Sequence, residues 1–142
     1  MSKKYPTYTI ELYQGSTEAI PIAFYSVDEN TKTPLIISND ADIVLVIRDE
    51  LSMDVLLTLS KSNGDIEVGT LNESGNSFVA DTSGNGVSNY AIKITFPSTL
   101  TEEFTIPKMV YELILVHSED NRELLLHGII LTHNGATGYV RA

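Results

Sequence analysis

Residues 122–133 read RELLLHGIILTH, and this stretch decides the fold class of the chain. Successive side chains of a β-strand point to opposite faces, so a strand with one face in water alternates apolar and polar residues. This stretch is apolar on both faces. The side chains of one face are Leu124, Leu126 and Ile130, and those of the other are Leu125, Ile129 and Leu131. We therefore expect a strand whose second face is covered either by a loop of its own chain or by a neighbouring subunit.

Other stretches of the chain also have the composition of β-strands. Asp42 to Asp49 (DIVLVIRD) is again apolar on both sides over much of its length, with Ile43, Leu45 and Ile47 on one face. Val87 to Phe96 alternates cleanly. Short strands about ten residues apart, separated by turn signals, are typical of an all-β sandwich or barrel. No helical periodicity is long enough for a layer of helices.

The connections between these strands carry recognisable signals. Pro21 cannot donate to a ladder, so its strand is expected at an edge or a bulge. Residues 26–34 read as a polar turn region, and Asn63-Gly64 as a tight turn. The one predicted helical turn covers residues 98–104, with Thr99 and Glu102 in a T-x-x-E capping pattern.

Composition limits the class of partner. The 142 residues suit one domain, expected over 1–142 with short arms at residues 1–6 and 134–142. The net charge of −10 argues against nucleic-acid binding, which needs cations to displace counterions from phosphate. No apolar stretch approaches the roughly 20 residues of a membrane-spanning helix, and no secretory signal opens the chain. We expect a soluble product that stays inside the cell or is released by lysis.

Catalytic and metal-binding patterns are weak. The chain has no cysteine and no G-x-S-x-G elbow, and His127 and His133 lie about 20 Å apart along an extended strand. Acidic clusters, including Asp40/Asp42 and Asp49/Asp54, are better explained as solvated turns than as calcium loops, although calcium remains an open alternative. We therefore expect no enzymatic activity, no metal and no cofactor.

Several motifs along the chain resemble a loose group of bacteriophage virion proteins that includes the N-terminal domain of baseplate upper proteins. The shared features are a Gly-containing turn followed by an apolar strand, a strand ending in I-R, a short helical turn, a Y-[DE]-L motif and a closing R-x-L-L-x-G pattern. In this chain they are Gln14–Thr17 with AIPIAF, Val44–Arg48, Ser98–Glu103, Tyr111–Leu113 and Arg122–Leu131 with Gly128. The resemblance spans residues 8–132.

This resemblance implies an immunoglobulin-like antiparallel β-sandwich that serves as a structural subunit of a phage particle, in the tail, baseplate or connector or as a capsid decoration. Its expected location is the virion, assembled in the host cytoplasm. Its expected partners are other virion proteins, in a homo-oligomer or a larger assembly, with no nucleic acid and no membrane. The expected interface residues are Tyr5, Tyr8, Leu125, Ile129, Leu131, Tyr139 and Arg141.

The second hypothesis is a carbohydrate-binding adhesion module, because many β-sandwiches bind sugars through exposed aromatic side chains. The chain has seven tyrosines but no tryptophan. Tyrosine combines apolar area with a hydroxyl group, which suits a protein interface equally well. An esterase or a metal-dependent enzyme comes third.

Overall fold

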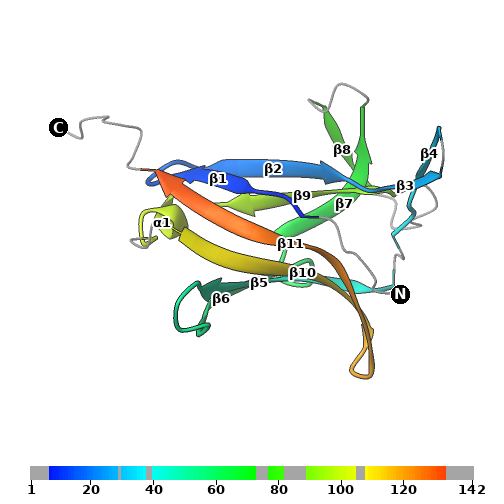
Figure 1. Cartoon of the computed structure of the whole chain (residues 1–142). Helices are drawn as coiled ribbons and strands as arrows, with labels where there is room; N and C mark the ends of the chain where they lie inside the picture. Colours follow the sequence, from blue (N-terminus) through cyan, green and yellow to red (C-terminus); the bar gives the residue numbers. More distant parts are fainter. Residues whose placement is uncertain are drawn as a thin grey trace.

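The computed structural model describes residues 7–28, 30–37, 40–72, 77–81, 89–104 and 108–133. Two sheets form the two layers of a sandwich (Figure 1). The five-stranded sheet has the order β1 (Ile10–Tyr13), β11 (Asn121–His133), β10 (Lys108–Ser118), β5 (Asp42–Asp49) and β6 (Val55–Ser60). The four-stranded sheet has the order β2 (Glu18–Ala23), β9 (Ala91–Phe96), β7 (Ile66–Leu71) and β8 (Phe78–Ala80).

This strand order is that of an immunoglobulin-like sandwich, and the predicted fold class is confirmed. β5, β10 and β11 occupy the places of strands C, F and G with β6 beside C, and β2, β9 and β7 those of B, E and D. One strand pair differs from the expected antiparallel pattern. β1 runs parallel to β11, with Ile10 opposite Ile130 and Tyr13 opposite His133.

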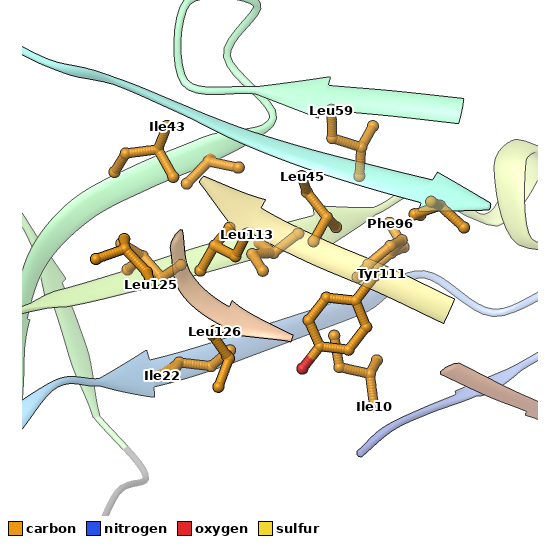
Figure 2. Close-up of a cluster of buried hydrophobic side chains, with 14 of the residues drawn as sticks. Ile10, Ile22, Ile43, Leu45, Leu59, Phe96, Tyr111, Leu113, Leu125 and Leu126 are labelled. Atoms are coloured by element: carbon orange, nitrogen blue, oxygen red, sulfur yellow. The ribbon is translucent and has the colours of Figure 1, made fainter. Parts of the chain in front are cut away.

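Hydrophobic side chains from both sheets form a single core, which is mainly aliphatic (Figure 2). Ile43, Leu45 and Ile47 of β5 are fully buried on alternate positions, as the sequence predicts, and Ile92 and Ile94 of β9 are fully buried as well. Antibody domains add an inter-sheet disulfide and a buried tryptophan to this architecture. With no cysteine and no tryptophan, this chain relies on the packing of aliphatic side chains together with Phe96 and Tyr111.

The helical turn α1 (Ser98–Thr101) forms where it was predicted, but its N-terminus is not capped as expected. The N-cap is Pro97 and no side chain caps it, so Thr99 lies inside the helix. Thr101 holds the turn in place instead. Its Oγ1 donates to the Ser16 carbonyl at 2.8 Å and accepts from the Gly15 amide at 3.1 Å. The helical turn is thereby joined to the turn between β1 and β2.

One connection differs from the sequence prediction. Within the polar region 26–34, β3 (Tyr25–Asp28) and β4 (Thr31–Pro34) form a two-stranded hairpin. The Asn63-Gly64 turn is present as predicted, with Gly64 at a φ of 86°, and it leads from β6 in one sheet to β7 in the other. Pro21 lies on β2, at an edge as predicted. Among the described residues, no helix is long and apolar enough to span a membrane.

Candidate interaction face

Two of the predicted interface residues, Ile129 and Leu131, lie on the outer face of the five-stranded sheet. Strand pairing sets which side chains share this face. Ile129 of β11 lies opposite Val110 of β10, which lies opposite Arg48 of β5. In the next row, Glu112 lies between His127 and Val46. The face therefore extends across at least three strands.

Most of this outer face is aliphatic. Eight of its side chains are neither fully buried nor fully exposed; they are Val44, Val46, Val110, Ile114, Val116, Leu124, Ile129 and Leu131. A sheet that faces only water usually presents polar side chains there. No strand or helix of the described chain packs over these residues as a third layer. The apolar second face anticipated from the sequence is thus partly exposed.

A β-bulge rearranges the two faces of β11. Leu126 pairs with Leu113 and Leu124 pairs with Ile114, which leaves Leu125 as the extra residue. A bulge of this kind interrupts the alternation of side chains along a strand. Leu125 consequently points into the core beside Leu126 (Figure 2), and Leu124 joins the outer face. The expectation that Leu125 is an interface residue was wrong.

The remaining predicted interface residues fall into two groups. Ile129 and Leu131 lie on the outer face and are half-buried, and Tyr8 is 44% exposed beside β11. Tyr5, Tyr139 and Arg141 lie outside the described residues. Tyr8 and Ile129 both line a depression in the surface.

This depression has a volume of about 590 Å³ and opens on the outer face. Its apolar wall includes Val110, Leu124 and Ile129. Its polar side chains include Arg48 and Glu112. A surface that mixes aliphatic area with a few charged groups offers both affinity and orientation to a partner.

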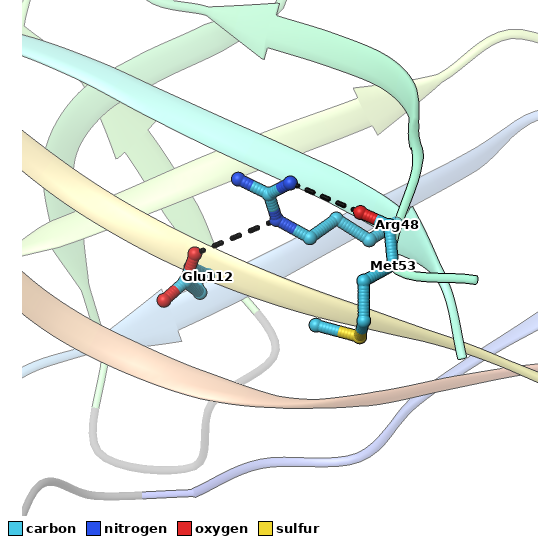
Figure 3. A network of polar contacts seen from close by, with 3 residues as sticks. All are labelled: Arg48, Met53 and Glu112. Carbon is cyan, nitrogen blue, oxygen red and sulfur yellow. Dashed lines mark hydrogen bonds and ion pairs between the residues drawn. The ribbon is translucent and has the colours of Figure 1, made fainter. Parts of the chain in front are cut away.

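Arg48 and Glu112, which both line the depression, form an ion pair (Figure 3). Arg48 Nε lies 3.9 Å from Glu112 Oε1, and Arg48 Nη1 donates to the Met53 carbonyl at 3.1 Å. Both side chains are partly exposed, so the pair contributes little to stability by itself. These two charged side chains lie among aliphatic neighbours, so they form a polar spot on a mainly apolar face. Sequence reasoning missed this pair, because only the pairing of β5 with β10 brings Arg48 near Glu112.

The N-terminal segment forms one wall of the depression. The Tyr8 amide donates to the His127 carbonyl at 3.2 Å, and the buried Tyr111 hydroxyl donates to the Tyr8 carbonyl at 2.5 Å. Gly128 permits this approach, since a Cβ there would collide with the Tyr8 carbonyl oxygen. Burial raises the pKa of Tyr111 above its ordinary value, and the neighbouring Tyr8 raises it further. Tyr111 therefore remains a neutral hydrogen-bond donor at physiological pH.

The described histidines and acidic residues do not converge on a metal site. His117 lies 3.6 Å from Glu123, whereas His133 lies 3.0 Å from Glu11 and stacks on Tyr13. In the described ranges, no group of three or more histidine and carboxylate side chains is arranged to hold a metal ion.

Two of the acidic residues weighed as calcium ligands support turns instead. Asp42 Oδ1 accepts from the Ser62 amide at 3.0 Å. Asp49 Oδ1 accepts from the Leu51 amide at 2.8 Å. These bonds fit the interpretation of the acidic clusters as turn residues.

Comparison with known proteins identifies no family. No family model matches the chain, and no curated protein matches it. Among solved structures, it is similar to the extracellular domain of the voltage-gated sodium channel beta4 subunit, at 10% identity and a TM-score of 0.39. The alignment covers 100% of this chain and 98% of that domain. That domain is described as forming parallel homodimers with a role in cell–cell adhesion.

Proposed function

We propose that this protein is a structural subunit of a bacteriophage particle and that it binds other virion proteins through the outer face of its five-stranded sheet. The observation that carries the proposal is the half-buried aliphatic surface across β5, β10 and β11, which no other layer of the described chain covers. The proposal involves no catalysis, no cofactor, no nucleic acid and no membrane. Its location is the virion, assembled in the host cytoplasm.

An aliphatic face that is left in contact with water is unfavourable. Burying apolar surface lowers the free energy by about 25 cal/mol per Å². A partner that removes side chains such as Val46, Ile114 and Ile129 from water is therefore bound more tightly. Large exposed apolar patches on soluble proteins mark interaction sites more often than chance allows. A partner must also satisfy Arg48 and Glu112, and this requirement selects its orientation.

The virion setting is supported by the motifs shared with phage virion proteins. Two of these motifs, Gln14–Thr17 and Ser98–Glu103, are in contact here through Thr101, although more than 80 residues separate them. Motifs that are far apart in the sequence but in contact in the structure are consistent with a pattern that belongs to the fold as a whole. Homo-oligomerisation or membership of a larger assembly completes the proposal.

The first test is the composition of phage particles. Particles from the source of this gene are purified on a density gradient, and their proteins are quantified by mass spectrometry. We expect the chain to co-sediment with the particles at a fixed ratio to the major structural proteins. Complete absence from intact particles would contradict the virion role.

The second test examines the face itself. Ile129→Asp places a charge on the aliphatic surface, and we expect this variant to remain folded but to be lost from the particles. The matched control is Val79→Asp, because Val79 is 62% exposed on β8 of the other sheet. Circular dichroism melting establishes that both variants fold. Incorporation of the folded Ile129→Asp variant at the wild-type level would rule out this face.

Carbohydrate binding is the second candidate, and the depression beside Tyr8 is the observation that favours it. Its walls combine an exposed aromatic side chain with Arg48 and Glu112, which are suitable hydrogen-bonding groups for a sugar. Tyr8→Ala removes the ring but keeps the carbonyl that accepts from Tyr111. Glycan binding that is lost in Tyr8→Ala and retained in Tyr13→Ala would favour this candidate.

A further inference from the structure

Arg48 and Glu112 are opposite charges on neighbouring strands within the outer face. Glu112 lies on β10, the middle strand of the five-stranded sheet, and Arg48 lies on β5 beside it. Strand pairing places Val46 opposite Glu112 and Val110 opposite Arg48. A partner that covers these aliphatic neighbours therefore also removes water from the two charges.

Neither charge is fully paired within one copy of the chain. Arg48 Nε lies 3.9 Å from Glu112 Oε1, which is longer than the roughly 2.8 Å of a charge-assisted hydrogen bond. Arg48 Nη1 donates to the Met53 carbonyl, and within the described chain the Glu112 carboxylate has no contact besides Arg48. A partner on this face must therefore bring an acceptor for Arg48 and a donor for Glu112, because burying poorly paired charges is costly.

A second copy of the chain supplies both groups at once. In a contact about a two-fold axis, each pairing between the copies occurs twice, once in each direction. When the axis passes between Arg48 and Glu112, the Arg48 of each copy faces the Glu112 of the other. The charges of this face are thus complementary to themselves.

We propose that a second copy packs its five-stranded sheet face to face on this one, about a two-fold axis between Arg48 and Glu112, so that two reciprocal ion pairs cross the interface. The inference rests on the proposed function and names the partner of its outer face. Stacked sheets lie about 10 Å apart, a gap that an arginine and a glutamate side chain span together. Aliphatic burial supplies the affinity, and the reciprocal ion pairs fix the orientation.

Met53 supplies adaptable contact area beside these ion pairs. Its side chain is 52% exposed and lines the depression together with Val110 and Ile129. A methionine side chain is unbranched and flexible, so it fits irregular gaps in a packed interface. The two Met53 side chains are therefore available to fill space that two rigid faces would leave empty.

Two-fold axes at other points of the ion pair lack this match. An axis through Arg48 would place two guanidinium groups together, and an axis through Glu112 would place two carboxylates together, and like charges brought together destabilise a contact. The net charge of −10 opposes all of these arrangements alike and is screened at physiological ionic strength. The local charges therefore select the orientation.

The other sheet carries a closely matched ion pair that serves as the control. Lys93 Nζ lies 3.1 Å from Glu67 Oε1, and the two side chains are 34% and 46% exposed, compared with 32% and 46% for Arg48 and Glu112. Reversing a charge in either pair changes the net charge of the protein by the same amount. Only the location of the reversed charge differs.

The test reverses the charges one at a time and then together. Sedimentation velocity of the full-length protein in about 0.15 M salt measures association. The dissociation constant is expected to rise more than about tenfold in Glu112→Arg and in Arg48→Glu, because each variant meets only like charges in its own dimer. An equimolar mixture of these two variants should restore the dimer, since the two arginines of one copy then face the two glutamates of the other. The double variant Arg48→Glu/Glu112→Arg should dimerise by itself.

The control variants Lys93→Glu and Glu67→Arg should associate as the wild type does, and circular dichroism melting establishes that every variant folds. Three results would overturn the proposal. They are a wild-type protein that stays monomeric at about 100 µM, well above ordinary micromolar affinities, a Glu112→Arg variant that associates like the wild type, and a mixture of the two folded single variants that fails to associate.

These measurements use purified protein, so they separate this inference from the proposed function. A monomeric wild type whose Ile129→Asp variant is lost from phage particles would keep the outer-face interface and exclude a second copy as its partner. A wild-type dimer with restored association in the variant mixture, but complete absence of the chain from particles, would keep the dimer and exclude the virion role.

Discussion

Tyr111 connects the core to the N-terminal segment through a single hydroxyl group. Its side chain is 2% exposed, and its hydroxyl reaches the carbonyl of Tyr8, 103 residues earlier in the chain. Within the described chain, this contact and the pairing of the same segment with β11 hold Tyr8 beside the depression. The geometry of the candidate site therefore depends on a residue whose side chain is almost inaccessible to a ligand.

We expect Tyr111→Phe to change how stability depends on alkaline pH. Because the pKa of Tyr111 is raised in the folded protein, its stabilising contribution is complete below about pH 10, the ordinary tyrosine pKa. Stability is then lost as the pH rises above that value, since the unfolded chain ionises first. Urea unfolding at several pH values should show a steeper alkaline loss in the wild type than in Tyr111→Phe. Parallel pH profiles for the two proteins would contradict the assignment.

The same variant should lose stability at neutral pH, because the Tyr8 carbonyl loses its donor. Removing one hydrogen bond of this kind costs about 1 kcal/mol. The neutral-pH loss thus provides a check that the substitution has removed the bond without disrupting the core.

At the scale of an element, the bulge in β11 determines which leucine side chains are buried in the core and which lies on the outer face. The sequence offers three consecutive leucines, Leu124 to Leu126, and strict alternation assigns Leu125 to the outer face. Pairing with β10 shifts by one residue at this point, so Leu125 and Leu126 are both buried. A bulge depends on the partner strand, and a single strand's sequence does not reveal it.

Alanine substitutions at neighbouring positions test this assignment. Leu125→Ala should cost about 2–4 kcal/mol of unfolding free energy, because it leaves a cavity in the core. Leu124→Ala should cost less than about 1 kcal/mol, since its side chain is half-buried on the outer face. Equilibrium urea unfolding of both variants gives the comparison. Equal losses, or a larger loss at Leu124, would place the bulge elsewhere.

Features that depend on neighbouring residues could be predicted from the sequence, whereas features that depend on contacts between distant residues could not. The strands of the core, the helical turn near residue 98 and the edge position of Pro21 are encoded by local composition and period, and they were predicted. The parallel pairing of β1, the Arg48–Glu112 contact and the Thr101 link depend on residues far apart in the chain. None of these has a local signal that a single sequence displays.

At the scale of the whole molecule, net charge opposes the homo-oligomerisation proposed through the outer face of the five-stranded sheet. Each copy carries a formal charge of −10, so two copies about 30 Å apart would repel by about 14 kcal/mol in water without salt. Salt screens this repulsion, leaving about 5 kcal/mol at 0.01 M and under about 1 kcal/mol at 0.1 M. Repulsion is therefore large only at low salt.

Self-association of the wild type should accordingly tighten as salt increases, by more than about tenfold between 0.01 M and 0.1 M. Sedimentation velocity across a salt series measures this trend. Wild-type association that weakens with salt would mean that ion pairs, and not the aliphatic outer face, hold the copies together.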